Sequence, residues 1–213
     1  MSFTGFGEDA VEFYDGLLAD NSKAYWTDRK DIYEGHVYGP MHALLAELEM
    51  EFGSGKIFRP YRDVRFSKDK SPYKTACGAT AGQFYVQISA DGLFVAAGYH
   101  QMTSDQVARF RAAVDDDRRG GDLAARLEAL EVAGLTVDGD RLKSRPRGVD
   151  PGHLRLELLR FRSLYAWRRW PPDDVLHEPT ALDRVAATWR VLRPLEEWLS
   201  DHVGPGEQAR RGS

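Results

Sequence analysis

Apolar residues recur every three or four positions through residues 10–48, which is the spacing of helices that bury one face. The recurring positions form three groups, namely Ala10, Phe13, Tyr14, Leu17 and Leu18, then Tyr25, Trp26 and Tyr33, then Val37, Met41, Leu44, Leu45 and Leu48. Asn21 and Ser22 separate the first two groups, and serine is a common cap of helix N-termini. Gly53 and Gly55 follow the third group, as glycines often do at helix C-termini. The pattern predicts three helices whose aromatic side chains lie in the core.

The repeat changes to two residues in the middle of the chain. Apolar side chains alternate with their neighbours over residues 84–89, as in a strand that buries one face. The turn-forming residues 90–92 and a second apolar run follow, so a β-hairpin is predicted over residues 83–99. Two further strands are predicted over residues 57–66 and 73–80.

Helical spacing returns in the second half of the chain, interrupted by short extended stretches. The predicted elements are a helix capped by Ser104 and running to Val114, a helix over 123–130, a small β-ribbon over 135–143, a helix over 154–161, a strand over 163–170 and a last helix beginning near Leu182. Pro194 is expected to kink the last helix, because proline has no N–H to donate.

This order of helices, strands and helices predicts an α+β fold. We expect a single domain over residues 1–203, with a central antiparallel or mixed sheet packed by N- and C-terminal helices. The chain has 213 residues, of which 42% are hydrophobic, so it can bury a substantial core. Residues 204–213 are expected to form a disordered tail.

Composition and motifs exclude several classes of protein. No run approaches the roughly 18 apolar residues that a membrane span needs, and the first residues lack the pattern of a signal peptide. The single cysteine, Cys77, has no internal partner, which fits a reducing compartment, so we expect a cytoplasmic protein. Phosphate-binding glycine loops are absent and the histidines are scattered, so we predict no cofactor and no metal.

The net charge of −4 hides two basic blocks. Residues 59–74 carry six Arg or Lys side chains against two Asp, and residues 141–170 carry nine against two acidic side chains. Such blocks create local positive fields in an acidic protein. Proteins that coat DNA or RNA are usually basic overall, so we do not expect bulk nucleic-acid binding.

The first block combines charge with aromatic side chains. If residues 61–66 are extended, Asp63 and Arg65 point to the same side, where the carboxylate can hold the guanidinium. Turn-forming residues 67–72 would then return the chain alongside, and the residues brought back are Lys70, Tyr73 and Lys74. Several fixed donors on one loop suit a phosphate or carboxylate ligand. Alternatively, the block is a structural ion-pair network with the acidic N-terminal helices.

A second loop carries Arg145 and Arg147, and we expect it to line the same electropositive pocket. The candidate ligand-binding residues are Arg59, Arg62, Asp63, Arg65, Asp69, Lys70, Tyr73, Lys74, Arg145 and Arg147. The expected ligand is an anionic small molecule or nucleotide that bears phosphate. Turnover, if there is any, would be hydrolysis or transfer at that group, with the arginines stabilising the charge that develops.

Two questions stay open at the level of sequence. Asp63, Asp69 and His153 are all candidates for a general base, and no catalytic residue is assigned. A carboxylate paired with arginine has a lowered pKa and is a poor base. The alternative function is a non-enzymatic interaction or scaffold module, in which the arginines serve folding. Nothing in the sequence indicates the oligomeric state.

The first block also resembles the motif of domain-of-unknown-function family 2461, which occurs in bacteria and in parts of longer fungal proteins. That motif is Arg-x-x-Arg-Asp-x-Arg-Phe followed by Asp or Asn, Lys and Tyr, and the matching residues are Arg59, Arg62, Asp63, Arg65, Phe66, Asp69, Lys70 and Tyr73. Residues 3–6 and 21–26 are similar to the opening helices of the family, and residues 145–153 are similar to its later block. The resemblance extends over most of the chain and implies no particular activity.

Overall fold

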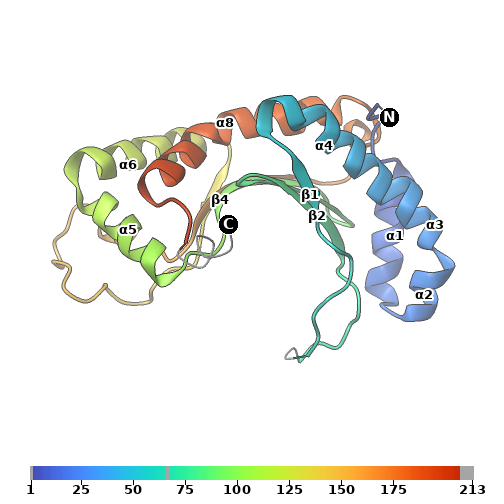
Figure 1. Ribbon diagram of the computed structural model, residues 1–213, viewed down its shortest axis with the longest axis horizontal. Helices are drawn as coiled ribbons and strands as arrows, with labels where there is room; N and C mark the ends of the chain where they lie inside the picture. The colour runs from blue at the N-terminus through green and yellow to red at the C-terminus, as the bar shows by residue number, and fades with distance from the viewer. Residues whose placement is uncertain (1, 66–67, 207–213) are drawn as a thin grey trace. The chain divides into compact units, whose positions relative to one another are not determined.

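The computed structural model describes residues 2–65 and 68–206 (Figure 1). The chain forms two compact units. Unit 1 comprises Met1–Val95 and Arg169–Thr188, and unit 2 comprises Ala96–Arg168 and Trp189–Ser213. The expectation of a single domain stays a prediction.

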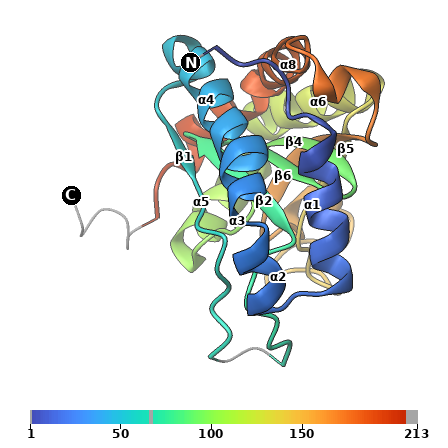
Figure 2. The same cartoon turned by 90° about the vertical axis from the view of Figure 1, so that its right-hand side faces the viewer.

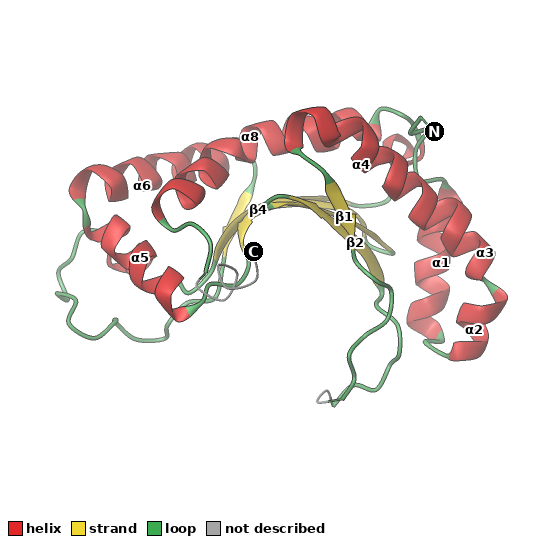
Figure 3. Cartoon of the chain, viewed as in Figure 1, coloured by secondary structure: helices red, strands yellow, loops and turns green. Residues whose placement is uncertain are grey.

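The strands form a sheet in the order β1-β2-β3-β4-β6-β5, in which the pairs β1–β2, β2–β3 and β5–β6 are antiparallel. They are β1 (Gly55–Ile57), β2 (Ala76–Ala81), β3 (Phe84–Ser89), β4 (Gly92–Tyr99), β5 (Thr136–Asp138) and β6 (Leu164–Trp170). Strands β3 and β4 are neighbours and form the hairpin predicted over residues 83–99. The predicted α+β fold with an antiparallel sheet is confirmed (Figure 3).

The helices of unit 1 arise from the three N-terminal apolar groups. They are α1 (Glu8–Ala19), α2 (Lys23–Asp28), α3 (Lys30–Ile32), a π-helix (Tyr33–Tyr38) and α4 (Gly39–Phe52). Helix α1 packs on β3, and α4 packs on β1 and β2 (Figure 2). Phe13, Tyr14, Trp26 and Tyr33 are all buried, which confirms that the N-terminal aromatic residues belong to the core. A short 3₁₀ helix (Asp174–His177) and the first residues of α8 (Ala181–His202) complete this unit.

Unit 2 is built around two consecutive helices. Helix α5 (Ser104–Asp115) packs against α6 (Asp117–Val132), α7 (Leu156–Leu159) packs on α5, and β5 packs on α6. The C-terminal part of α8 adds Trp198, whose ring lies edge-on to Phe110 with the centroids 6.1 Å apart. Both rings are buried, so they join α5 and α8 in one core.

Of the two helix N-caps predicted from the sequence, one is observed and one is shifted by a residue. Ser22 caps α2 as predicted, because its hydroxyl oxygen accepts the N–H of Tyr25 at 3.1 Å. Helix α5 is capped by Thr103 instead of Ser104. A capping box explains the shift, since the Gln106 side chain accepts the Thr103 N–H at 2.9 Å.

The predicted β-ribbon over residues 135–143 is wrong. Strand β5 pairs with β6, and Arg141 bridges Phe161, so this stretch pairs with a later part of the chain and not with itself. The close approach needs Gly139, where an added Cβ would lie 2.1 Å from the Ser163 carbonyl oxygen. The Ser163 hydroxyl oxygen also accepts the Asp140 N–H at 2.7 Å.

Several predicted boundaries also differ. Strand β1 ends at Ile57 and β2 begins at Ala76, so most of the strand predicted over 57–66 is loop. Proline at position 60 contributes to this ending, because it has no N–H for a ladder. Helix α8 continues through Pro194.

The beginning of the predicted C-terminal tail is attached to unit 2. The Gln106 side chain donates to the Gly204 carbonyl oxygen at 2.8 Å, and the Arg109 guanidinium donates to the Pro205 carbonyl oxygen at 2.8 Å. Residues 207–213 of that tail lie outside the described residues.

Candidate functional site

The first basic block forms the connection between β1 and β2 in unit 1, residues 58–75, which we call the β1–β2 connection. Its two limbs run antiparallel, with the Lys74 N–H donating to the Pro60 carbonyl at 2.8 Å and the Arg62 N–H donating to the Pro72 carbonyl at 2.9 Å. Tyr61 and Tyr73 form an isolated antiparallel bridge. The predicted return of the chain alongside its first limb is therefore confirmed.

The base of the β1–β2 connection is anchored to the N-terminal helices. The Asn21 side chain takes the place of a strand partner, accepting the Tyr73 N–H at 3.0 Å and donating to the Tyr73 carbonyl oxygen at 3.1 Å. The Tyr73 ring stacks on Trp26, with centroids 4.3 Å apart and planes 6° apart. One backbone position is thus fixed by both hydrogen bonding and ring packing.

Two ion pairs form within the connection itself. The Arg65 guanidinium binds Asp63 through two hydrogen bonds of 3.0 and 2.7 Å, which confirms the predicted contact. Arg62 pairs with Asp69, whose carboxylate also accepts the N–H and the hydroxyl of Ser71. The predicted strand is not formed here, since Arg65 lies in a bend and Asp63 in no regular element. The contact between Asp63 and Arg65 therefore does not depend on an extended strand.

These contacts lower the pKa of both carboxyl groups. The Ser71 hydroxyl and N–H, followed by Arg62, lower the pKa of Asp69 to about 2. The hydrogen bonds from Arg65 lower the pKa of Asp63. Both groups are therefore ionised at neutral pH and are weak candidates for a general base.

Three further cations of the connection make no ion pair with any described residue. Arg59 and Lys68 are exposed, and Lys74 is half-buried with its ammonium 5.4 Å from the Phe58 ring centroid. The Lys70 ammonium donates to the Val64 carbonyl oxygen at 3.0 Å, which cross-links the tip. Six cations against two carboxylates leave an excess of four positive charges on one loop.

An exposed aromatic surface lies beside these cations. Tyr61 is 51% exposed, and its ring lies 5.5 Å from that of Tyr73 and 6.1 Å from that of Trp26. A flat ligand can stack on such a surface, and a guanidinium beside it can bind an attached phosphate.

Cys77 lies on β2 in the core, close to buried tyrosines. Burial raises the pKa of its thiol to about 12, although a hydrogen bond with Tyr33 opposes the change. Burial also raises the pKa of Tyr14, Tyr33 and Tyr85. A thiol with so high a pKa is not a nucleophile at neutral pH.

The predicted second loop belongs to unit 2. The Arg145 guanidinium donates to the Val149 carbonyl oxygen, and the Val149 N–H donates to the Pro146 carbonyl oxygen at 3.3 Å. Gly148 has a φ of 85°, as the third position of a type II turn requires. Arg145 thus closes its own loop, whereas Arg147 is exposed and makes no ion pair with a described residue. A pocket shared with the β1–β2 connection stays a prediction.

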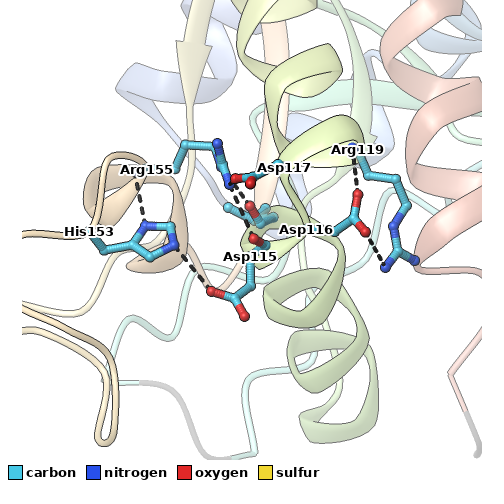
Figure 4. Close-up of polar contacts among 7 residues, drawn as sticks. Asp115, Asp116, Asp117, Arg119, His153 and Arg155 are labelled. Carbon is cyan, nitrogen blue, oxygen red and sulfur yellow. Dashed lines mark hydrogen bonds and ion pairs between the residues drawn. The ribbon is translucent and has the colours of Figure 1, made fainter.

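A second polar cluster follows that loop (Figure 4). The His153 Nδ1 accepts the Arg155 N–H at 3.0 Å, so its Nε2 carries the proton and donates to Asp115 at 3.1 Å. The Arg155 guanidinium donates to the Val114 carbonyl oxygen at 2.8 Å and to the Asp117 carboxylate at 2.8 Å. Both ring nitrogens of His153 are engaged within the fold, which leaves neither for general-base catalysis.

The same segment lines a hollow of about 560 Å³ in unit 2. Its lining combines apolar side chains of α6 and α7 with charged ones, and includes Leu127, Glu128, Glu131, Arg141, His153 and Phe161. The Arg141 guanidinium lies 4.0 Å from the Phe161 ring centroid.

Sequence reasoning missed the residues that fix these segments. Asn21 and Arg155 act on chain segments far away in sequence, and neither periodicity nor local charge marks them. Periodicity places Trp26 in the core but does not show that its ring stacks on Tyr73. Three consecutive aspartates predict a solvated charge run, and the side chains of Asp115–Asp117 are exposed. Asp116 nevertheless caps α6, and the other two bind His153 and Arg155.

Two absences apply to the described part of the chain. It contains no group of three or more His, Cys, Asp or Glu side chains placed to hold a metal ion. Among its helices, none combines the length and the apolar character needed to cross a membrane.

Residues 9–198 match a protein family described as "Conserved hypothetical protein (DUF2461)". Comparisons with curated proteins and with solved structures find no match. The matched range contains both the β1–β2 connection and the loop of Arg145 and Arg147. The family prediction from sequence is confirmed, and the chain belongs to the DUF2461 family of conserved hypothetical proteins.

Proposed function

We propose that the β1–β2 connection binds an anionic ligand that bears phosphate, either a small molecule or a nucleotide. One observation carries the proposal. The two carboxylates of the connection are used by Arg62 and Arg65, while Arg59, Lys68 and Lys74 make no ion pair with a described residue. A bound anion would neutralise an excess of charge that these residues leave unbalanced.

The paired arginines would still contribute to binding. A guanidinium is planar and carries five N–H donors, so one group can hold a carboxylate and present a positive charge to a ligand at the same time. Asp63 would orient Arg65, and Asp69 would orient Arg62, so that each presents its planar group in a fixed direction. Tyr61 would stack on the base of a nucleotide, with the anchored Tyr73 and Trp26 behind it.

The proposal concerns binding and assigns no catalytic residue. Asp63 and Asp69 have lowered pKa values, and His153 uses both ring nitrogens within unit 2. Arg145 and Arg147 belong to unit 2, so the proposal is independent of them. The competing function is a scaffold module in which the same ion pairs only hold the loop together.

A thermal-shift screen with phosphate, pyrophosphate, nucleotides and sulfate tests the proposal. A ligand at 100 times its Kd adds about 2.7 kcal/mol of stability, which raises the Tm by several degrees. We expect the shift to be lost in Arg62→Ala and Lys70→Ala. Lys30→Ala is the matched control, because it removes an exposed cation of α3 that pairs only with Glu34 across one turn.

Two results would contradict the proposal. One is the absence of a shift with every anion. The other is a shift that persists in both Arg62→Ala and Lys70→Ala. The scaffold function predicts a different pattern, in which Arg62→Ala lowers the Tm strongly and no anion changes the Tm of the unaltered protein.

A further inference from the structure

Unit 2 contains a second basic feature in the first half of α6, next to the run Asp115–Asp117. A hollow of about 530 Å³ lies there, and every side chain that lines it is charged or titratable. The lining residues are Arg118, Arg119, Asp122, Arg126 and His202. The first four come from α6, and His202 is the last residue of α8.

The helical repeat explains why these residues meet. Arg118, Asp122 and Arg126 are spaced four residues apart, which places them on one face of α6. Arg119 follows Arg118 and also reaches the hollow. The sequence therefore builds a stripe of three guanidinium groups with a single carboxylate between them.

The charges of this stripe are only partly balanced. The Arg126 Nε donates to Asp122 at 3.0 Å, and Arg119 lies 3.4 Å from the Asp116 carboxylate. Arg118 is exposed and makes no ion pair with a described residue. Two of the three arginines therefore have a carboxylate partner, and Arg118 leaves one positive charge in excess at the hollow.

The hollow has a rigid floor. Trp198 is buried, and its Nε1–H donates to the Arg119 carbonyl oxygen at 3.1 Å, which ties α8 to the first turn of α6. The His202 ring lies edge-on to Trp198 with centroids 4.9 Å apart. The Arg126 Nη1 also donates to the Pro194 carbonyl oxygen at 2.7 Å. These contacts hold the backbone at Arg119, the His202 ring and the Arg126 guanidinium before any ligand arrives, which reduces the entropic cost of binding.

We propose that this hollow binds a compact anion of the phosphate class, such as inorganic pyrophosphate. Arginine side chains can bind phosphate oxygens through two parallel hydrogen bonds, and Arg118 and Arg119 both line the hollow. The lining contains no Phe, Tyr, Trp or aliphatic side chain, so it suits a compact anion better than a nucleobase. This site lies in unit 2 and does not depend on the function proposed for the β1–β2 connection.

Isothermal titration calorimetry with inorganic pyrophosphate tests this site. We expect the double variant Arg118→Gln, Arg119→Gln to bind at least about tenfold more weakly, because each arginine contributes charge-assisted hydrogen bonds. Lys143→Gln is the matched control, since it removes an exposed cation of unit 2 outside the hollow. Urea denaturation of each variant confirms that the protein still folds.

The variant Arg62→Ala, Lys70→Ala separates this site from the β1–β2 connection. Pyrophosphate should still bind that variant, and amide NMR signals of residues 118–122 should shift on titration. The proposal is overturned if the Arg118→Gln, Arg119→Gln variant binds as tightly as the unaltered protein, or if millimolar pyrophosphate gives neither heat nor shifts at residues 118–122. Loss of all binding in Arg62→Ala, Lys70→Ala would also overturn it and would favour the β1–β2 connection alone.

Discussion

The two basic blocks of this chain use their arginines in different ways. In the β1–β2 connection, Arg62 and Arg65 bind carboxylates of the same loop. In unit 2, Arg155 binds the Val114 carbonyl oxygen and Arg160 binds the Leu142 carbonyl oxygen, at 2.8 Å each. Each also binds a carboxylate, but the backbone contacts join segments far apart in sequence. Similar local charge densities thus give an exposed cationic loop in one unit and a set of structural cross-links in the other.

The two blocks differ in the partner atoms of their guanidinium groups and in the exposure of those groups. Carbonyl oxygens at a helix C-terminus have no partner within the helix, and Arg155 provides one where α5 ends. The Arg155 side chain is 9% exposed, whereas the Arg65 side chain is 77% exposed. Arginine density alone therefore does not distinguish a binding surface from a structural element, but the partner atom and the exposure do.

The largest expected effect concerns how the β1–β2 connection is anchored. Replacing Trp26 with Ala removes a buried ring that stacks on Tyr73, and we expect a loss of about 4 kcal/mol in the free energy of unfolding. Chemical denaturation measures this loss. Trp26→Phe keeps an aromatic ring and should lose less than half as much. Equal losses in both variants would show that the stack contributes little.

The second effect tests the structural role of arginine in unit 2. Arg155→Ala leaves the carbonyl groups of Val114 and Asp115 without their partner, and we expect a loss of about 2 kcal/mol. The midpoint of urea unfolding reports it. Arg155→Lys retains the charge without the planar fork, so it should recover only part of the stability. If Arg155→Ala leaves the free energy of unfolding unchanged, the contrast between the two basic blocks is wrong.

The third effect should be small for stability. Arg65→Ala is expected to leave the free energy of unfolding almost unchanged, because an exposed ion pair contributes little. The same variant should weaken any anion-dependent rise in Tm if the proposed function holds. A strong destabilisation by Arg65→Ala, measured by the same urea titration, would instead assign the connection a structural role.

The smallest effect depends on pH. The pKa of Asp69 is lowered to about 2 in the folded protein, so its contribution to stability is present above the unfolded pKa of about 4. That contribution is lost as the pH falls from about 4 towards 2, because protonation removes the contacts with Ser71 and Arg62. NMR titration of the Asp69 carboxyl group measures the midpoint directly. A midpoint near 4 would mean that the contacts do not persist in solution.

The comparison also shows which features the sequence could predict. The hairpin of β3 and β4 follows from a two-residue repeat, and the return of the β1–β2 connection follows from its turn residues. The pairing of β5 with β6 could not be read locally, because its partner lies almost 30 residues later and the approach depends on Gly139. Asn21 and Arg155 were missed for the same reason, since each acts through a backbone group distant in sequence.

The pair of hydrogen bonds between the Asn21 side chain and the Tyr73 backbone has a consequence for the chemical ageing of the protein. Asparagine side chains slowly hydrolyse to carboxylates, and a small following residue such as Ser22 leaves the amide accessible to that reaction. The product keeps the acceptor for the Tyr73 N–H but loses the donor, so two oxygens would face each other where a hydrogen bond of 3.1 Å now exists. Molecules in which Asn21 has become Asp would therefore hold the base of the β1–β2 connection less firmly, and peptide mass spectrometry identifies them.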